Sequence, residues 1–272
     1  MSEHFFITLP SNSSMDVFPD NKITRFKTQL SKRVVLRGEW EVGLVEIHYP
    51  YSFNNITSKE FWVGFQYDVA PPAKDLTVQS QTSTETPVTV AGKTGAAAQW
   101  TLITFPGGMY SSIDNLFAVM RRDENFKKAA DIFIHQGNVH IRPKENIQYF
   151  SVSPALQKIF NLPARDFKSY IQALNPYKLD ALIPTQMYIY TDIAEPQHVG
   201  DTLAPLLRII NIEKHKNPLG AEIVNTFTHP HYIPVLKREF NQIEVDIRDD
   251  LGESLPFVKG QLNVKLHFRK IE

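Results

Sequence analysis

The C-terminal stretch 240–270 alternates apolar and polar positions more regularly than any other part of the chain. Successive side chains of a β-strand point to opposite faces, so this alternation predicts two half-buried strands joined by a loop rich in Asp, Gly and Pro. Two strands with one apolar face need a second layer, and the pattern therefore predicts a β-sandwich completed by strands from elsewhere in the chain. The predicted core residues of this terminal pair are Ile243, Val245, Ile247, Leu262, Val264, Leu266 and Phe268.

The N-terminal part of the chain supplies further strand patterns. Residues 5–9 form a short apolar run, and residues 23–30 alternate weakly, which is typical of an edge strand. Residues 40–49 carry apolar side chains at both parities, and this predicts a strand covered on both sides. Residues 61–69 place Phe61, Val63, Phe65 and Tyr67 in phase and predict a fourth strand.

The middle of the chain differs in composition. Residues 71–99 are rich in Thr, Ser, Ala and Pro and offer little to bury, so we expect an exposed excursion with at most one hairpin, around Pro87–Val90. Helical and hairpin signals follow this excursion. They predict a strand at 100–105, a helix at 112–122 that begins after Ser111, a hairpin of Asp131–His135 with Val139–Arg142, and a short helix after Ser153 and Pro154.

Strand patterns return at 186–193 and 203–212. Neither end of the chain alone has enough in-phase strands to close a core, so we expect 1–69 and 185–272 to pair in one sandwich. Residues 70–184 are then an outward-facing insertion of mixed α and β structure. The predicted fold class is mainly β: a β-sandwich with a smaller inserted α+β region.

Composition narrows the range of partners. The chain of 272 residues has 29 basic and 29 acidic residues, so no net charge attracts it to nucleic acid or anionic lipid. It contains no cysteine, which removes disulfides, thiolate metal sites and cysteine nucleophiles. No window approaches about 18 consecutive apolar residues, and we therefore expect no membrane segment.

Candidate chemical sites are weak. The glycines of PGGMYSS lack a following Lys, so a turn before a helix is favoured over a phosphate-binding loop. His229 and His231 flank a proline without a nearby third ligand, and His135 and His140 flank a hairpin tip, where exposure is the ordinary explanation. The carboxylates of Asp246, Asp249 and Asp250 lack calcium-loop spacing and indicate a solvated turn. We expect no catalytic residues, no cofactor and no metal.

Several long phrases resemble one family in the same order along the chain. They are LPSNSSMDVFPDN, WEVGLVEIHYP, YTDIAEPQHVGDTLAPLLRI and FNQIEVDIRDDLGESLPFVKGQLNVKLHFR. These phrases resemble the minor capsid, or penton, protein of Polinton (Maverick) elements and adintoviruses. The resemblance implies a single jelly-roll capsid protein of the virion, a homopentamer at icosahedral vertices surrounded by a double jelly-roll major capsid protein. In such a protein the outward-facing insertion 70–184 would carry any contact with a host receptor, and the balanced charge indicates no specific nucleic-acid partner.

A pentamer needs two different surfaces on each subunit, because its contacts are head-to-tail and close by rotation. We expect one of them in the Pro-rich stretch AEPQHVGDTLAPLLR, where prolines and glycine fix the path and leucines supply apolar area. The alternative is that these leucines belong to the core. The candidate interface residues are Pro196, Gly200, Leu203, Pro205 and Leu206.

A carbohydrate- or receptor-binding β-sandwich module is the alternative function. Such a module uses exposed aromatic side chains near polar loops, for which Tyr49, Tyr51, Phe53 and Trp62 are the candidates. A metal-dependent enzyme on a jelly roll would need a cluster of inward-facing histidines, and the histidines of this chain are scattered.

Overall fold

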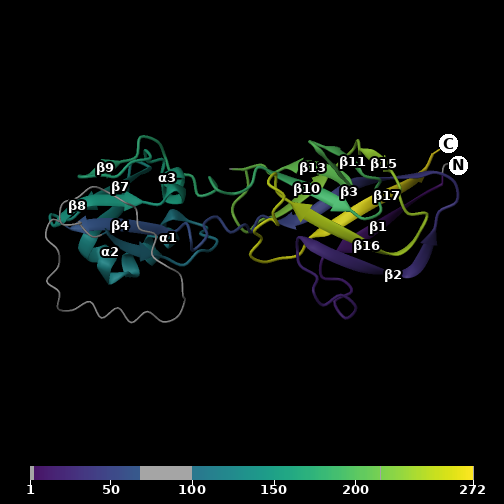
Figure 1. The fold of residues 1–272 in the computed structure, drawn as a ribbon, viewed down its shortest axis with the longest axis horizontal. Helices are drawn as coiled ribbons and strands as arrows, with labels where there is room; N and C mark the ends of the chain where they lie inside the picture. The colour runs from purple at the N-terminus through teal and green to yellow at the C-terminus, as the bar shows by residue number, and fades with distance from the viewer. Residues whose placement is uncertain (1–2, 68–99, 215, 272) are drawn as a thin grey trace. The chain divides into compact units, whose positions relative to one another are not determined.

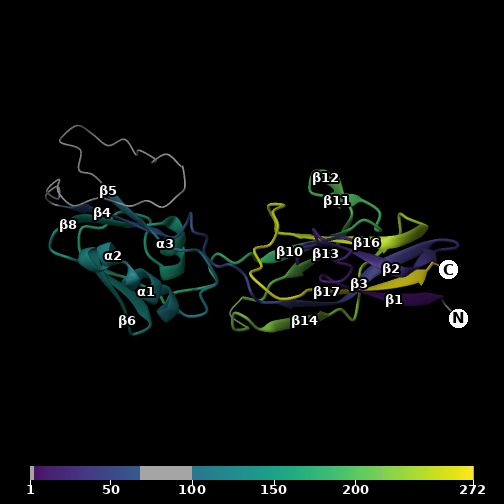
Figure 2. The same ribbon diagram turned by 90° about the horizontal axis from the view of Figure 1, so that it is seen from below.

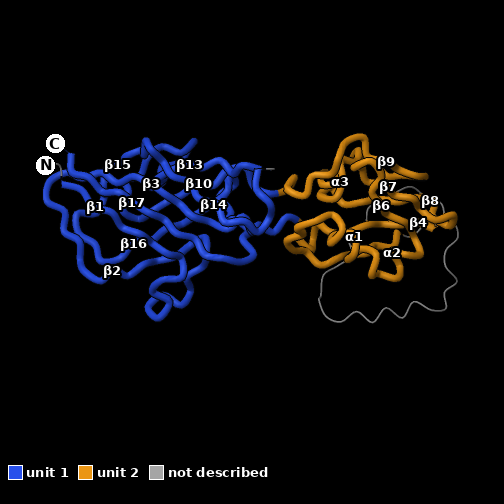
Figure 3. The backbone as a smooth tube through the Cα atoms, turned by 180° about the vertical axis from the view of Figure 1, so that it is seen from behind, with its two compact units in different colours: residues 1–55, 183–272 blue, residues 56–182 orange. Residues whose placement is uncertain are grey.

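The computed structural model describes residues 3–67, 100–214 and 216–271. The chain divides into two compact units, unit 1 with residues 1–55 and 183–272 and unit 2 with residues 56–182 (Figure 3). The polar excursion 71–99, with the hairpin expected around Pro87–Val90, lies outside the described residues.

Unit 1 is built from antiparallel strands (Figure 1). They are β1 (His4–Pro10), β2 (Arg25–Val35), β3 (Trp40–Pro50), β10 (Gln186–Thr191), β11 (Gln197–Val199), β12 (Thr202–Ala204), β13 (Leu206–Asn211), β14 (Glu222–Thr226), β15 (Tyr232–Pro234), β16 (Glu239–Arg248) and β17 (Asn263–Lys270). One large sheet has the order β1-β17-β3-β14, with β15 also paired to β3, and a second has the order β13-β10-β16-β2. β11 and β12 pair with each other in a separate two-stranded sheet.

The two sheets form the two layers of a sandwich (Figure 2). Without the short β11, β12 and β15, the strands in chain order alternate between the layers, except that β10 and β13 are neighbours in one sheet. This double-sheet Greek-key arrangement is the jelly roll. The predicted fold class is therefore confirmed, and β2 lies at a sheet edge, as its weak alternation predicted.

The two ends of the chain share these sheets. β1 pairs with β17, with Phe5 opposite Phe268, and β2 pairs with β16, with Phe26 opposite Val245. The backbone N–H of Lys270 donates to the carbonyl of Glu3 at 3.0 Å, which holds the termini at one end of unit 1. The chain leaves unit 1 after β3 and returns before β10, at the opposite end of the sandwich.

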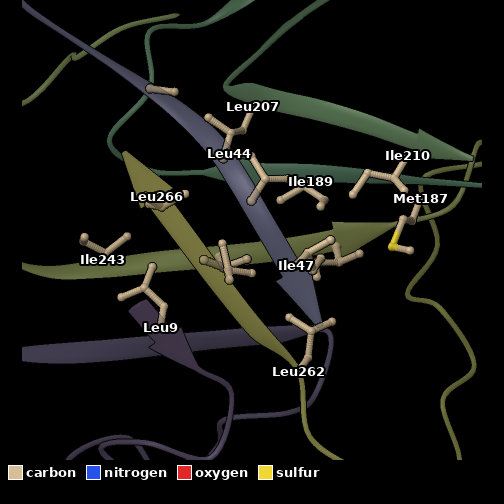
Figure 4. Packing of buried hydrophobic residues seen from close by; sticks show 14 of the residues in the cluster. Leu9, Leu44, Ile47, Met187, Ile189, Leu207, Ile210, Ile243, Leu262 and Leu266 are labelled. Atoms are coloured by element: carbon tan, nitrogen blue, oxygen red, sulfur yellow. The ribbon is translucent and has the colours of Figure 1, made fainter. Parts of the chain in front are cut away.

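The core of unit 1 lies between the two layers. The terminal strand pair contributes all seven side chains expected from its alternation, each at most 1% exposed. They interdigitate with side chains from the other elements, among them Leu9, Leu44, Met187, Ile189 and Leu207 (Figure 4). The period of two in the sequence thus specifies which face of each strand is buried.

A β-bulge explains the apolar positions of both parities in β3. Leu266 of β17 lies opposite Leu44 and Lys265 lies opposite Glu46, so Val45 is an extra residue that has no partner in β17. Residues such as Leu44 before the bulge and Ile47 after it consequently face the same core. The prediction that this strand is covered on both sides is wrong, because the change of parity reflects a shift of register.

Unit 2 has its own core and its own sheets. Its elements are β4 (Trp62–Tyr67), β5 (Trp100–Thr104), α1 (Ile113–Arg122), α2 (Glu124–Ala129), β6 (Ala130–His135), β7 (Asn138–Pro143), β8 (Ile147–Val152), α3 (Pro154–Phe160) and β9 (Ile171–Gln172). The sheets have the orders β5-β4-β8 and β6-β7-β9. α1 buries the apolar face that its spacing predicted, and Phe65 and Phe150 pack together at 5.1 Å between ring centroids.

The predicted first boundary of the insertion is wrong. The strand at 61–69 was expected in the jelly roll, whereas β4 is the central strand of a unit 2 sheet and the division falls at 55–56. Alternation shows which face of a strand is buried but not which core covers it. The second boundary falls at 182–183, close to the expected one.

Most of the helix starts and turns predicted for unit 2 from local sequence are present in the structure, with small differences. Ser112, rather than Ser111, caps α1 by accepting from the N–H of Asn115, and Asp123 caps α2, which was not predicted. The hairpin of β6 and β7 turns through Gln136 and Gly137, whose φ values are 49° and 78°. β8 and β9 were also not predicted: β9 has only two residues, and a register shift between Ile147 and Tyr149 breaks the alternation of β8.

Candidate interaction surfaces

The hairpin of β11 and β12 contains Gly200 and Leu203 of the five expected interface residues, and Pro196 and Pro205 flank it. Gly200 forms its tip with φ of +62°, a left-handed conformation that glycine adopts without strain. The hydroxyl of Thr202 donates to the carbonyl of Val199 at 3.1 Å across the turn. At the open end of the hairpin the Gln197 amide donates to the carbonyl of Leu206. The hairpin therefore has a defined shape without a core of its own.

The structure separates the leucines of this stretch. Leu203 is 65% exposed on the hairpin, whereas Leu206 and Leu207 are 8% and 2% exposed. Pro196 and Gly200 are exposed and Pro205, which ends β12, is half-buried. Leu206 thus offers little area to a partner, and Leu203 carries the apolar surface of the hairpin.

The base of the hairpin is fastened to the segment after β15. The N–H of Glu195 donates to the carbonyl of Pro234 at 2.9 Å, and Ala194 bridges Val235. Asp192 accepts from the N–H of Glu244 at 2.8 Å and forms an ion pair with Lys237 at 2.5 Å. These bonds hold the hairpin at the end of the sandwich where the termini lie.

A cluster of aromatic and imidazole rings covers the outer face of β1, β17 and β15. His267 stacks on Phe6 at 4.4 Å between centroids, and its ring nitrogens lie 2.7 Å from the Tyr232 hydroxyl and 3.2 Å from His4. Burial lowers the pKa of His267, and the neighbouring His4 and Arg269 lower it further. The imidazole is consequently neutral near pH 7.

Gly43 makes room for this cluster. A Cβ at position 43 would lie 3.1 Å from the Tyr232 ring and 3.0 Å from the carbonyl of His231. Tyr232, directly opposite in β15, can therefore cross β3 and reach His267. Phe6 remains 51% exposed, so the cluster has an apolar rim.

The carboxylates and histidines considered as metal ligands do not converge. Asp249 accepts from the N–H groups of Leu251 and Glu253, both at 2.9 Å, and Asp246 pairs with Arg248 at 2.8 Å, which is the chemistry of a turn. Within residues 3–67, 100–214 and 216–271, no group of three or more His, Asp or Glu side chains is placed to hold a metal ion. No helix in the same ranges is long and apolar enough to cross a membrane.

The aromatic residues considered for carbohydrate binding on the jelly roll are buried. Tyr49, Tyr51 and Phe53 are at most 2% exposed, and burial raises the pKa of Tyr49 to about 12. The prediction that these residues form an exposed binding platform is wrong. After the bulge in β3 the side chain of Tyr49 points to the core side of the strand. Trp62 is half-buried and belongs to unit 2.

Unit 2 contains a groove that the sequence pattern did not reveal. It has a volume of about 1020 Å³ and is lined by residues of β8, α3, β9 and the connection between α3 and β9. Its side chains include Tyr149, Lys158, Arg165, Lys168 and Tyr170. The connection contains the sequence RDFKSY, and its interleaved basic and aromatic residues are the signal that could have identified the groove.

His140 supports one wall of the groove. It is 2% exposed, contrary to the exposure expected beside a hairpin tip, because its ring stacks on Phe133 at 5.3 Å between centroids. Its Nδ1 is hydrogen-bonded to the Tyr170 hydroxyl. Tyr170 is 47% exposed, so a buried imidazole orients a partly exposed ring.

The strand order of unit 1, with a second unit inserted between β3 and β10, defines a single jelly roll of the kind found in viral penton proteins. Among solved structures, the mavirus penton protein matches with a TM-score of 0.55 and 11% identity, over 99% of this chain and 100% of that one. A chain of the Sputnik virophage matches with a TM-score of 0.52 and 11% identity, over 99% and 98%. Neither a family model nor a curated protein matches the sequence. The resemblance to penton proteins is confirmed at the level of the fold.

Proposed function

We propose that this chain is a structural capsid protein, the penton subunit that forms homopentamers at icosahedral vertices of a virion. The observation that carries the proposal is the end-to-end likeness of the jelly roll and its insertion to the mavirus penton protein. In this proposal a double jelly-roll major capsid protein surrounds the pentamer. The subunit has no catalytic role.

The sandwich has two open sides that suit a head-to-tail ring. β13, β14 and the short β15 are the edge strands on one side, and β1 and β2 are the edge strands on the other. Exposed edges are normally covered in native proteins, and Ile209 of β13 and Val224 of β14 are 42% and 54% exposed. Contacts between unlike sides of neighbouring subunits can close into a ring by rotation. The hairpin carrying Leu203 would enlarge this contact.

Unit 2 faces outward in this assembly. Its two connections leave the jelly roll at the end opposite the termini, where long loops are accommodated without disturbing the core. Unit 2 is then the part that reaches a host receptor. Its sequence contains no Arg-Gly-Asp triplet, which gives no support to an integrin contact.

The proposal is tested by mass and by assembly. Light scattering of the purified protein over a range of concentrations should give the mass of five subunits, and co-expression with the major capsid protein should give closed shells with occupied vertices. A monomer at all concentrations that also fails to join such shells would refute the proposed function.

Leu203→Glu should weaken the pentamer, because it places a charge on apolar surface that becomes covered. The expected loss is about tenfold or more in the association constant between subunits. Leu251→Glu is the matched control, since Leu251 is 82% exposed on the loop at the other end of the sandwich. Equal masses for both variants under dilution would exclude the hairpin from the interface.

A receptor-binding module remains the second candidate function. The observation in its favour is the groove of unit 2, a concavity whose lining includes the cations Lys158, Arg165 and Lys168. The two functions are compatible in one subunit, because they use different units.

A further inference from the structure

The groove of unit 2 has walls of fixed geometry. Ser153 caps α3 by accepting from the N–H of Leu156 at 3.2 Å, and Asn161 ends it in a left-handed conformation with φ of 55°. The Asn161 amide donates to the carbonyl of Pro176. Phe167, in the connection that follows, pairs with Phe150 of β8 through two backbone hydrogen bonds of 2.8 Å. The lining residues are therefore held by the same core as the rest of unit 2.

The groove carries an excess of positive charge. Lys158, Arg165 and Lys168 line it with one carboxylate, Asp166, and within the described part of the chain none of the three cations forms an ion pair. Outside the groove Lys127 pairs with Glu124 and Lys144 with Asp131, whereas Arg122 and Lys128 form no ion pair in the described part of the chain, so what distinguishes the groove is that three such cations lie together. Unpaired cations gathered in one concavity attract a ligand with negative charge.

Aromatic faces lie among these cations. The Nζ of Lys168 lies 4.7 Å from the centroid of the Tyr149 ring, and Arg142 lies 5.8 Å from that of Tyr170. Gln172 and Asn175 add amide groups to the lining. Aromatic rings pack on the C–H faces of sugars, amides bond to hydroxyls, and cations bind acidic substituents.

We propose that the groove lined by residues of 149–175 binds an anionic oligosaccharide. Tyr170 and Tyr149 contact the sugar rings, and Lys158, Arg165 and Lys168 bind its acidic groups. Carboxylated and sulfated sugars share this chemistry. The proposal concerns unit 2 alone and does not depend on assembly of the jelly roll, so the test below leaves the pentamer untouched.

Isothermal titration of the full chain at about 0.1 M salt tests the proposal. The probes are a sialylated trisaccharide, a heparin-derived hexasaccharide, a neutral oligosaccharide and a short single-stranded DNA. We expect saturable binding of at least one acidic sugar, and at least about tenfold weaker binding of the neutral sugar and of the DNA. Tighter binding of the sialylated trisaccharide would indicate a preference for carboxylated sugars, and tighter binding of the heparin-derived hexasaccharide a preference for sulfated sugars.

Two variants locate the binding. Lys158→Gln, Arg165→Gln and Lys168→Gln combined should weaken it at least about tenfold, and Tyr170→Ala, which keeps every charge, should weaken it about fivefold. Melting curves show whether each variant is folded. A loss with the charge variant but none with Tyr170→Ala would refute a saccharide site.

The matched control is Arg122→Gln, Lys127→Gln and Lys128→Gln combined, which removes the same charge from the exposed surface of α1 and α2. We expect its affinity to stay within about twofold of the parent, since these residues do not line the groove. An equal loss in the control, tighter binding of DNA than of both acidic sugars, or no binding of either acidic sugar would each overturn the proposal.

Discussion

At the residue scale, single side chains of the terminal strands determine whether the sandwich folds. Val264 is fully buried and lies between Leu9 of β1 and Ile47 of β3 in the register of the sheet. Val264→Asp should lower the free energy of unfolding by about 4 kcal/mol or more, because a carboxylate would lie there without a partner. Urea unfolding beside Gln261→Asp, at an exposed position before the same strand, measures the difference. Comparable stability of the two variants would contradict the assigned core.

His267 predicts how stability depends on pH. Folding lowers the pKa of His267 below its unfolded value of about 6.5. The contribution of His267 to the free energy of unfolding is therefore fully present above the unfolded pKa and is lost as the pH falls through the folded pKa. His4 on β1, Lys265 and Arg269 on β17, Tyr232 on β15 and Glu41 on β3 surround it.

His267→Gln should therefore flatten the loss of stability between pH 7 and pH 5. Urea unfolding at several pH values measures it, with His231→Gln as the control for removing a histidine at an exposed position. If the free energy of unfolding changed with pH in the same way for the parent and for His267→Gln, protonation of His267 would not affect stability.

At the scale of elements, the two glycines of the PGG turn have different roles. A Cβ on Gly107 would lie 2.3 Å from the backbone nitrogen of Ser58, whereas one on Gly108 would meet nothing closer than 3.9 Å. Gly107→Ala should destabilise unit 2 by about 2 kcal/mol or more, and Gly108→Ala by about 1 kcal/mol or less. Thermal melting and limited proteolysis compare them. Similar effects would indicate that the turn relaxes around a methyl group.

The sequence predicted the buried faces of strands and the starts of helices better than it predicted which strands pair with each other. Alternation identified the buried residues of β16 and β17, and Ser153 with Pro154 marked the start of α3, because both signals are local. The bulge at Val45 and the position of β4 in unit 2 depend on pairing with strands far away in the chain. The groove could not be predicted for the same reason, since its lining residues from β8 and β9 come together only in the folded unit.

At the scale of the whole molecule, two separate cores predict two unfolding transitions. Unit 1 and unit 2 each bury their own cluster of apolar side chains, and the chain passes between them twice. Calorimetry should resolve two transitions, with Val264→Asp shifting or abolishing one and Gly107→Ala shifting the other. A single transition that both variants move together would mean that the units unfold as one.

The position of β17 in its sheet has a consequence for synthesis. β17, the last strand of the jelly roll in chain order, lies between β1 and β3, two of the first, so this layer of the jelly roll cannot close until the chain has been made as far as Lys270. Unit 2 is contiguous in the chain and its core is complete well before that point. A nascent chain therefore carries a finished unit 2 while its jelly roll is still open, so the unit that the chain begins first is the last to be completed.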